Sequence, residues 1–421
     1  MIAKFDASSG ISRRQFIGGT FAAAAATSLP VFAANEPSTA SSSTPAPAPR
    51  TEFKRKIKVG VIGNGGRGAW IAKLFKEHGG YELWALADYF PSAVDACGDE
   101  LGVDRSRRFS TLSGYKRLIE SGVDAVAIET PPYFMPEQSL AAIEAGLHVY
   151  MAKPVAVDVP GALQIEATGK LATASKRCFL IDYQIPTDPV NIEIVRRIHE
   201  GGLGRIAHVS TTGLSTGCKD QRKGPTIEDR LQHLVWVNDV ALGCDYIGNF
   251  DIHAIDAALW ALQERPVAAM GSSSIRRPEP YGDARDVCSL VYEYESGVVH
   301  SHFGQALKDN IDMTLCAAIY GTEANAMIEY TKRSFLRGGK LQDAGGQIKG
   351  LYKAGAERNI ARFYREITGE QFENDTIRRS VDGVLACVLG YEAAARNTRL
   401  TMDEVLRANR RLEVDLTGLK T

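Results

Sequence analysis

The sequence predicts an α/β protein whose N-terminal domain is a Rossmann fold, built on a doubly wound parallel sheet. Three observations support this. A β-type run leads into a glycine-rich turn, a helix, a second strand and an acidic residue, all between Ile57 and Asp88. Strand and helix patterns then alternate up to Lys153, as they do in parallel sheets. After about Ile206 the chain is rich in β runs joined by turns, which indicates a second sheet.

Residues 1–34 are predicted to be a twin-arginine export signal rather than part of the fold. Arg13 and Arg14 directly precede a Gly/Ala-rich apolar run that ends near Phe32 at small residues suited to cleavage. A stray apolar helix with two chance arginines is the alternative. Residues 35–52 have the Pro, Ala, Ser and Thr content of a flexible linker. We therefore expect a periplasmic or otherwise exported protein that the twin-arginine machinery recognises.

Composition limits the partners and the metal chemistry. The 49 basic and 50 acidic residues give a formal net charge of -1, so charge gives no reason to expect nucleic acid or an anionic membrane. The 7 cysteines include no C-x-x-C pair, which favours buried reduced thiols over a disulfide framework. His300 and His302 alternate on a strand, but they suggest a metal only with a third ligand, and we expect no metal.

The first strand–turn–helix unit has the pattern of a dinucleotide site. The run Ile57–Ile62 leads into Gly63–Gly68, which fits G-x-G-x-x-G, and a helical pattern continues from Ala69 to about His78. The next strand, Glu82–Asp88, ends in an acid at the spacing typical of such sites. The whole unit is far more specific than its glycines alone. The alternative is a glycine-rich turn in some other α/β protein.

Each part of this unit has a task. Gly63 permits the tight turn, Gly65 lets the backbone approach a pyrophosphate, and Gly68 lets helix and strand pack closely. The helix N-terminus supplies amide donors and positive potential to phosphates. Asp88 can accept hydrogen bonds from the ribose hydroxyls and would repel a 2′-phosphate, so NAD is favoured over NADP.

The alternation of strands and helices continues beyond this unit. An apolar strand, Asp124–Thr130, is ended by prolines, and a helical pattern follows from Pro136 to Ala145. The next strand, His148–Met151, leads to Lys153. Because ligands bind beyond the carboxyl ends of parallel strands, residues there are candidate ligand contacts. The predicted cofactor-binding residues are Gly63, Asn64, Gly65, Gly66, Arg67, Gly68, Asp88, Thr130, Pro131, Lys153 and Gln184.

From about Lys56 onward the sequence resembles the Gfo/Idh/MocA oxidoreductases, the family of glucose–fructose oxidoreductase and inositol dehydrogenase. Many landmarks occur in the family's order, and they are specific for the family but much less so for the substrate. They are the glycine loop, Thr130-Pro131-Pro132, Ala145–Val149 leading to Lys153-Pro154, Tyr183-Gln184, Ile198–Ile206, Asp251–Asp256, Tyr320–Glu323, Arg358–Ile360 and the closing helices from Val381.

The resemblance implies a Rossmann domain over residues 53–180 and a substrate-binding α/β domain over residues 181–421, built on a large open, mostly antiparallel sheet. Family members often form dimers or tetramers through that sheet, so we expect a homo-oligomer. The β runs Val287–Tyr294, Val298–Gln305 and Thr314–Tyr320 agree with this expectation.

Three positions depart from the family pattern. Ala152 stands where the family usually has the Glu of Glu-Lys-Pro, and Met135 stands where a His commonly follows the Thr-Pro turn. Asn249 replaces the usual acid four residues before the family's His. These changes leave the fold assignment intact and put the nicotinamide contact and the proton transfer in question.

Lys153 and His253 are the predicted catalytic residues. Oxidation of an alcohol requires removal of a hydride, which a nicotinamide accepts, and of a proton, which the protein must accept. The resemblance implies that Lys153 polarises the reacting oxygen and that His253 takes the proton. The alternatives are a surface lysine that ends a strand and a core histidine on an amphipathic helix. Asp256 would either orient the imidazole or cap the helix start.

The predicted substrate contacts are Asn249, Asp251, His253 and Tyr183. Asn249 can hydrogen-bond a sugar hydroxyl but cannot act as a base. The charged residues of Lys219–Arg230 and the pair Gln232-His233 are expected to form a solvated loop, which in this family can border the substrate cleft.

Three functions remain open. The first is an exported NAD(P)-dependent oxidoreductase that acts on a hydroxyl of a sugar, glycoside or polyol. The second is an NAD-dependent glycosidase, which oxidises a sugar hydroxyl transiently and releases the aglycone while it retains its cofactor. Export favours a tightly bound cofactor in either case. The third is a sugar-binding protein without catalysis, which the replacements at Ala152, Met135 and Asn249 favour and the intact Lys153 and His253 disfavour.

Overall fold

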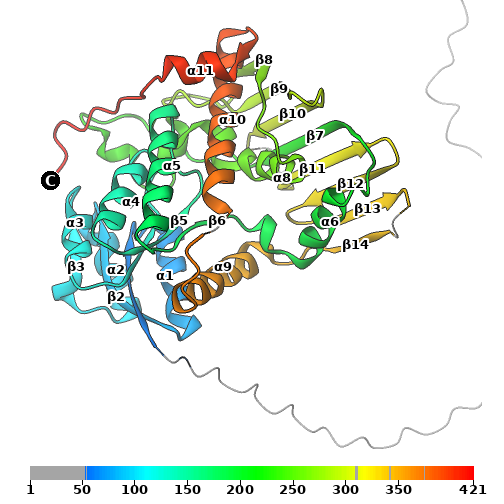
Figure 1. Ribbon diagram of the computed structural model, residues 1–421. Coiled ribbons are helices and arrows are strands. Elements are labelled where there is room, and N and C mark those ends of the chain that lie inside the picture. The colour runs from blue at the N-terminus through cyan, green and yellow to red at the C-terminus, as the bar shows by residue number, and fades with distance from the viewer. Residues whose placement is uncertain (1–52, 54, 309–311, 341–342, 374) are drawn as a thin grey trace, which may run out of the picture. The chain divides into compact units, whose positions relative to one another are not determined.

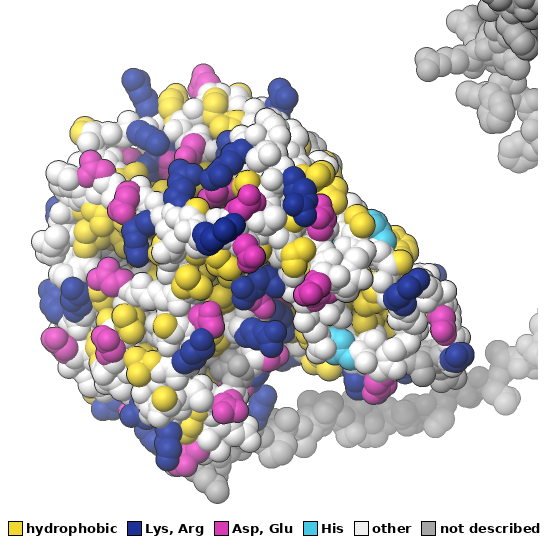
Figure 2. Space-filling model, turned by 45° about the horizontal axis from the view of Figure 1, so that its top comes forward, with side chains coloured by type: hydrophobic (Ala, Val, Ile, Leu, Met, Phe, Trp, Pro, Cys, Tyr) yellow, Lys and Arg dark blue, Asp and Glu magenta, His cyan; other side chains and the backbone are white. Residues whose placement is uncertain are grey.

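The computed structural model describes residues 53, 55–308, 312–340, 343–373 and 375–421 (Figure 1). The predicted export signal and linker, residues 1–34 and 35–52, lie outside the described residues. Among the described helices, none combines the length and the apolar character that crossing a membrane requires. Figure 2 shows basic and acidic side chains intermingled over the visible face, as the near-neutral net charge predicts.

The first sheet confirms the predicted Rossmann architecture. Its six strands run parallel in the order β3-β2-β1-β4-β5-β6. Strands β2 and β3 are added on one side of β1, and the chain then returns to add β4, β5 and β6 on the other side. Strands β1, β4 and β6 are largely buried and mostly apolar, as expected for a sheet covered on both faces. They are β1 (Ile57–Ile62), β2 (Tyr81–Asp88), β3 (Arg108–Ser110), β4 (Ala125–Ile128), β5 (His148–Ala152) and β6 (Phe179–Asp182).

The helices that cover this sheet come from both ends of the described chain. Phe75 of α1 packs against Phe363 of α9, with ring centroids 6.4 Å apart, although the two residues are far apart in sequence. A late helix therefore completes the core of the first sheet (Figure 1). The covering helices are α1 (Gly66–His78), α2 (Pro91–Leu101), α3 (Gly114–Ile119), α4 (Met135–Glu144), α5 (Val159–Ala174) and α9 (Leu351–Thr368).

The second sheet has nine strands in the order β14-β13-β12-β11-β7-β10-β9-β8-β15, and it confirms the expected large, mostly antiparallel sheet. One pair in it, β7 with β10, is parallel. The strands are β7 (Ile206–Ser215), β8 (Ala268–Ser274), β9 (Val287–Glu293), β10 (Val299–Ala306), β11 (Thr314–Gly321), β12 (Ala324–Glu329), β13 (Arg333–Gly338), β14 (Ala344–Gln347) and β15 (Leu400–Thr401).

Helices cover one face of the second sheet, where α8 lies against β11 and β7 and α10 lies against β8 (Figure 1). The opposite face carries Val299, Phe303 and Tyr320, each close to half exposed. The seven cysteines all belong to the described residues, and they are unpaired, as predicted. The helices of this half are α6 (Pro189–His199), α7 (Val240–Gly243), α8 (Ile252–Leu262), α10 (Thr376–Arg396) and α11 (Met402–Ala408).

Candidate active site

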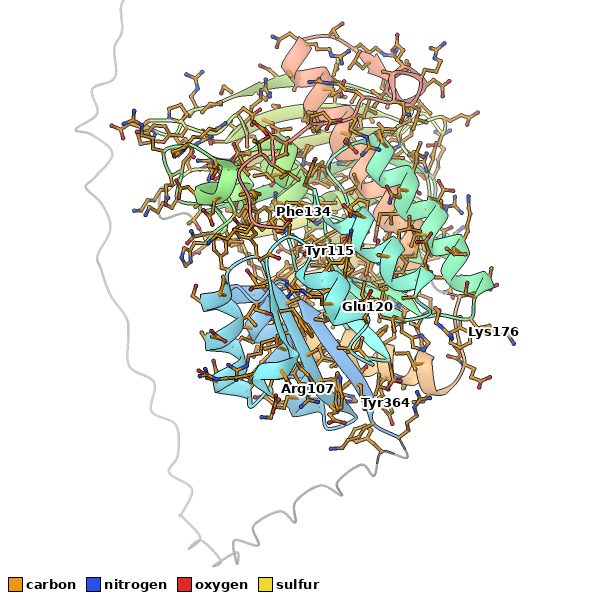
Figure 3. The ribbon with its side chains drawn as sticks, turned by 90° about the vertical axis from the view of Figure 1, so that its left-hand side faces the viewer. Arg107, Tyr115, Glu120, Phe134, Lys176 and Tyr364 are labelled. Atoms are coloured by element: carbon orange, nitrogen blue, oxygen red, sulfur yellow. The ribbon has the colours of Figure 1, made fainter. Side chains whose placement is uncertain are left out.

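A cavity of about 1400 Å³ extends from the glycine loop to α8 and the second sheet. It begins beyond the carboxyl ends of the parallel strands, where a ligand of such a sheet is expected. Figure 3 shows Tyr115 and Phe134, which both line the cavity, between the two sheets, whereas Arg107 and Tyr364 lie at the opposite end of the first sheet. The predicted cofactor and catalytic residues therefore converge on one large space.

The glycine loop leaves room for a dinucleotide. Gly65 and Gly66 line the cavity, and a Cβ built on either of them would meet no atom of the described residues within 4 Å. Helix α1 begins at Gly66, so its free amides lie at the cavity wall. Gly68 is different, because a Cβ there would overlap the carbonyl oxygen of Gly63. The first two glycines keep space for a ligand, and Gly68 keeps the helix close to the strand.

Asp88 lies at the end of β2 and lines the same cavity. Its two carboxylate oxygens accept backbone N–H groups, from Asn64 at 2.6 Å and from Phe90 at 2.9 Å, and burial raises its pKa. Each oxygen keeps a lone pair for a ribose hydroxyl. The residues present thus fit an adenosine dinucleotide.

The C-terminal tail also reaches this end of the cavity, which the sequence did not indicate. The carbonyl of Lys420 accepts the N–H of Leu112 at 3.0 Å, and the N–H of Lys420 donates to the Tyr89 hydroxyl at 3.2 Å. Leu416 and Thr421 line the cavity. Because the tail has no hydrophobic periodicity, no local pattern could have placed it there.

Lys153, Asn249 and His253 lie at the other end of the cavity, and all three line it. Lys153 follows β5, and its Nζ donates to the backbone carbonyl of Asn249 in a π-helical turn, Ile247–Asp251, that precedes α8. The amide nitrogen of Asn249 is turned inward and donates to the carbonyls of Gly243 and Asp245. The fold therefore brings the two predicted catalytic residues together, Lys153 from the end of β5 and His253 from helix α8.

Burial sets the charges of these two residues. It lowers the pKa of Lys153 to about 7, and the positive charge of Arg67 adds to this effect. It also holds the pKa of His253 well below its usual value, with Lys153 contributing. Nδ1 of His253 is buried without a hydrogen-bond partner among the described residues, and its ring packs edge-on against Tyr330, with centroids 5.1 Å apart. Near neutral pH, Lys153 rather than His253 is the group whose protonation changes.

Arg67 belongs to the glycine loop, but its side chain turns towards the first sheet. Its guanidinium pairs with Glu129 at 3.0 Å and with Asp182, and it donates to the Tyr352 hydroxyl at 2.8 Å. Burial raises the pKa of Glu129 to about 7 despite this cation. The sequence pattern placed Arg67 among the phosphate-loop residues and gave no sign of these partners.

The other predicted site residues divide into two groups. Thr130, Pro131 and Gln184 line the cavity. Tyr183 and Asp251 do not: the Tyr183 hydroxyl lies close to Gly383 of α10, and Asp251 bonds His302 Nε2 at 3.2 Å. Their roles as substrate contacts remain predictions. Sequence reasoning missed several lining residues, among them Trp236, Phe250, Tyr330 and Tyr352.

Asp256 takes neither of the two roles considered for it. It pairs with Arg379 of α10 at 2.7 Å, and burial raises its pKa to about 6. Nδ1 of His253 has no partner in the described part of the chain, and α8 starts four residues before Asp256. The ion pair joins two helices that cover the second sheet.

His302 does have potential ligand neighbours. Single ligand atoms of Asp251, Cys288 and His302 lie within 4.8 Å of one another. However, Nε2 of His302 already bonds Asp251, and its Nδ1 bonds the Thr211 hydroxyl at 2.9 Å. These side chains satisfy one another without an ion, so the prediction that no metal binds stands as a prediction.

The loop from Lys219 to Arg230 is not wholly solvated, contrary to expectation. Arg230 is fully buried and pairs with Asp220 at 2.7 Å and Asp239 at 2.6 Å. These ion pairs hold the loop, and Gln232 and His233 beyond it line the cavity. Charge alone could not distinguish a buried network from a solvated surface.

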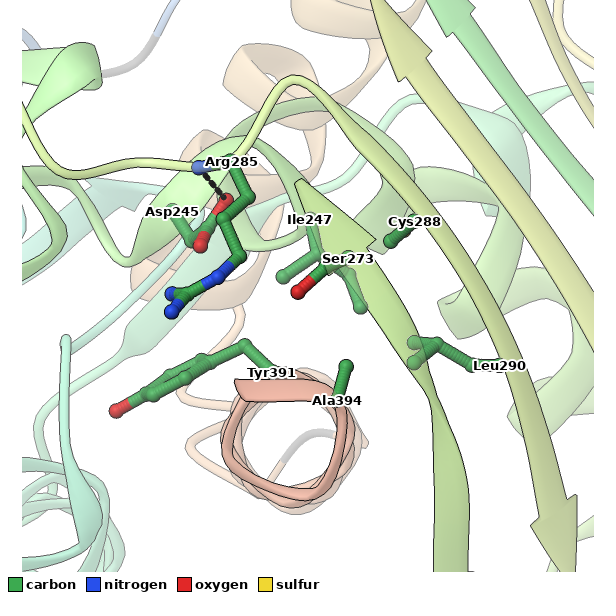
Figure 4. Close-up of a pocket in the computed structure, with 8 residues that line it drawn as sticks. All are labelled: Asp245, Ile247, Ser273, Arg285, Cys288, Leu290, Tyr391 and Ala394. Atoms are coloured by element: carbon green, nitrogen blue, oxygen red, sulfur yellow. Dashed lines mark hydrogen bonds between the residues drawn. The ribbon is translucent and has the colours of Figure 1, made fainter. Parts of the chain in front are cut away.

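A second cavity, of only about 10 Å³, lies between β8, β9 and α10 (Figure 4). Asp245 Oδ1 accepts the backbone N–H of Arg285 at 3.2 Å, and Asp245 Oδ2 and Ser273 Oγ face this region without partners among the residues that the structure describes. The space is about that of one water molecule, which these polar atoms could hold. It is too small for a substrate.

Comparisons with known proteins agree with this geometry. Residues 57–181 match the oxidoreductase family with an NAD-binding Rossmann fold, and residues 192–327 match the Gfo/Idh/MocA C-terminal domain. The chain is 23% identical to an inositol 2-dehydrogenase of Rhizobium meliloti over 234 residues. The matched segment covers 56% of this chain and 63% of that protein. It is 25% identical over 166 residues to an alpha-N-acetylgalactosaminidase of Shewanella oneidensis, covering 38% of this chain and 35% of that protein.

The fold agrees with a solved structure of an inositol dehydrogenase homologue from Azotobacter vinelandii, which is complexed with NAD+. The two superpose with a TM-score of 0.70 at 20% identity, over 83% of this chain and 98% of that one. The matched segments span less than two thirds of the inositol dehydrogenase sequence from Rhizobium meliloti. On the two domain matches, this chain belongs to the Gfo/Idh/MocA family of NAD-binding oxidoreductases.

Proposed function

We propose that this protein is an exported NAD-dependent dehydrogenase that oxidises or reduces a hydroxyl of a sugar, glycoside or polyol. One observation carries the proposal: Lys153, Asn249 and His253 line the same cavity as the glycine loop and Asp88. The inositol 2-dehydrogenase among the relatives supports a polyhydroxylated substrate. The tail residues Leu416 and Thr421 at the adenosine end support a cofactor that is bound tightly.

The residues of this chain have separate tasks in such a reaction. A bound nicotinamide supplies the acceptor or donor of the hydride. Lys153 hydrogen-bonds the reacting oxygen and, with a pKa of about 7, takes its proton during oxidation. His253 stays neutral and bonds the same or a neighbouring hydroxyl through its imidazole. Gln184 and Tyr330, joined by a 3.1 Å hydrogen bond, close the wall beside them.

The test begins with the purified protein. Released dinucleotide is identified after denaturation, and sugars, polyols and aryl glycosides are then screened separately for nicotinamide absorbance and for aglycone release. Reduction of nicotinamide by a sugar or polyol is expected. If the protein binds NAD and sugars but neither signal appears across the panel, the dehydrogenase proposal is wrong and a binding role takes its place.

The second candidate is an NAD-dependent glycosidase. The similarity to an alpha-N-acetylgalactosaminidase is the observation that favours it. A retained cofactor suits it, because transient oxidation followed by re-reduction causes no net change in the nicotinamide. Aglycone release without accumulation of reduced nicotinamide would select this function.

We predict that NAD binds more tightly than NADP because the Asp88 carboxylate lies at the end of β2 and lines the cavity. A 2′-phosphate would meet its negative charge. Asp88→Ala should weaken NAD binding and remove the repulsion of the 2′-phosphate of NADP. The difference between the affinities for NAD and NADP should therefore become smaller. Titration of each dinucleotide against the two proteins measures this. Equal or tighter binding of NADP by the unaltered protein would contradict the role of Asp88.

Export is a proposal that rests on the sequence alone. Arg13→Lys combined with Arg14→Lys should leave folded, unprocessed protein in the cytoplasm, because the twin-arginine pathway reads the paired arginines. Cell fractionation with immunodetection of the precursor measures this. Processed protein beyond the inner membrane in the double variant would show that another pathway is used.

We also infer that the open face of the second sheet joins copies of the chain into a dimer or tetramer. Val299, Phe303 and Tyr320 are 46%, 45% and 46% exposed on it, and the register brings strands β7, β10 and β11 side by side there. Apolar side chains gathered on one face mark an interaction site. Sedimentation of the purified protein, with Phe303→Glu as the disrupting variant, measures the assembly.

A further inference from the structure

A buried ion cluster lies beneath Lys153, and neither the family resemblance nor the cofactor site explains it. The Arg67 guanidinium is held between the carboxylates of Glu129 and Asp182. The side chain of Glu129 is 1% exposed and that of Asp182 is fully buried, whereas that of Arg67 is 27% exposed. Asp182 is fixed from its other side by the Asn359 amide of α9 at 2.7 Å. Two carboxylates that share one cation are thus buried within reach of the catalytic lysine's charge.

The sheet register explains why these groups meet. Ile128 pairs with Met151 on β5, so Glu129 follows at the level of Ala152, and Ala152 pairs with Asp182 on β6. The two acids therefore flank Ala152 from the neighbouring strands. The family usually has a glutamate at the position of Ala152. The small Ala152 side chain leaves the space between the two acids open, and the Arg67 guanidinium bridges them.

We propose that Arg67 is a positioning residue for Lys153: by binding Glu129 and Asp182, it prevents these carboxylates from capturing the Lys153 ammonium. Lys153 then stays turned towards the carbonyl of Asn249 and the cavity. This inference rests on the proposed dehydrogenase function for its purpose, but the geometry it describes exists without substrate.

The charges around Lys153 have opposite effects on it. Arg67 lowers its pKa, whereas Glu129 and Asp182 raise it, and burial, the largest cause, lowers it. An opposite charge at close range typically shifts a pKa by about 1–3 units. Glu129, whose pKa burial raises to about 7, and Lys153 each act on the charge of the other. The titratable and charged groups whose charges act on Lys153, or on which its charge acts, are Arg67 of α1, Glu129 after β4, Asp182 of β6, Asp251 before α8, His253 of α8 and Cys387 of α10.

The experiment uses two substitutions that should move Lys153 in opposite directions. Arg67→Met frees both carboxylates, and we expect it to raise the pKa of Lys153 by about one unit or more. Glu129→Gln removes one carboxylate at constant size, and we expect it to lower that pKa. The double variant should fall between the two. The full chain is labelled with 13Cε-lysine, and the Lys153 signal, assigned by its absence in Lys153→Gln, is titrated by NMR.

Three further measurements separate positioning from a structural role and from the proposed function. Arg108→Met, which breaks pairs with Asp95 and Asp99 elsewhere in the first domain, should leave the Lys153 titration unchanged. Once a substrate is known, the rise of kcat/KM with pH should move with the NMR value in each variant. Arg67→Lys keeps the positive charge but not the two-sided bridge to Glu129 and Asp182. We expect the pKa of Lys153 in this variant to lie between its values in the unaltered protein and in Arg67→Met.

The outcomes are distinct. Opposite shifts in Arg67→Met and Glu129→Gln support the positioning role whether or not a sugar is ever oxidised. If Arg67→Met does not fold, a fall in the Lys153 pKa in Glu129→Gln still supports the proposal, and no change there overturns it. Shifts in the same direction in both single variants also overturn it. Unchanged titrations together with normal sugar oxidation would leave the proposed function intact and reject Arg67 alone.

Discussion

Lys153→Ala is expected to lower turnover by roughly 10²–10⁴-fold, because it removes the group that exchanges the proton of the reacting hydroxyl. The side chain is partly buried at the cavity wall and its amine has a pKa of about 7. In the oxidation direction, kcat/KM of the unaltered enzyme should rise with pH through about 7, since only the neutral amine accepts a proton. The variant should lose this step. Steady-state kinetics across the range from acidic to alkaline pH measures both effects.

His253→Ala belongs to the same test. It should lower turnover by at least about a hundred-fold while NAD affinity changes little, because His253 lies on α8 at the substrate end of the cavity. The double variant should lose much less than the product of the two single losses, since residues that act as a unit are not additive. Lys170→Ala, on the exposed side of α5, is the control and should be neutral. Near-normal turnover in His253→Ala would show that the imidazole does not hold the reacting hydroxyl, and His233, which also lines the cavity, would be the next candidate for that contact.

The sequence predicted the parts of the fold that depend on local pattern. The strand Ile57–Ile62 and the end of the next strand at Asp88 were placed correctly, because a buried strand ends where its apolar run meets a turn. Asp88 and Lys153 line the cavity because the carboxyl ends of parallel strands meet at one edge of a sheet. His253 also lines the cavity, and it was predicted from the family motif. Such features need only spacing along the chain.

The remaining parts depend on contacts between distant segments. Arg67 of α1 meets Asp182 of β6 although β6 lies three strands from β1, and nothing near Arg67 in the sequence shows this contact. Asp251 faces His302 and His253 faces the cavity, because residues two apart on a helical segment lie on nearly opposite faces. Motif reasoning assigned both residues to the substrate. The contact of Asp251 with His302 of β10 comes from the distant second sheet, which no motif near Asp251 shows.

Gly65→Ala and Gly68→Ala form the second pair of large expected effects. In Gly68→Ala the new Cβ would overlap the backbone carbonyl oxygen of Gly63, and no rotamer change can relieve a clash with backbone. We expect a loss of stability of about 1–3 kcal/mol, measured as a fall in the free energy of unfolding in urea. The helix must move away from the strand, so NAD affinity should fall as well.

Gly65→Ala should separate binding from stability. Its backbone angles, φ -67° and ψ -171°, suit any residue, and the new Cβ would meet no atom of the described chain within 4 Å, so the free energy of unfolding should stay close to that of the unaltered protein. The same Cβ points into the space that the pyrophosphate needs, and we expect NAD affinity to fall by about tenfold or more, which corresponds to about 1.4 kcal/mol. Calorimetric titration of NAD and urea unfolding of both variants measure the contrast. Unchanged NAD affinity in a folded Gly65→Ala would mean that the dinucleotide does not approach this loop, and the assignment of the cavity to NAD would then fail.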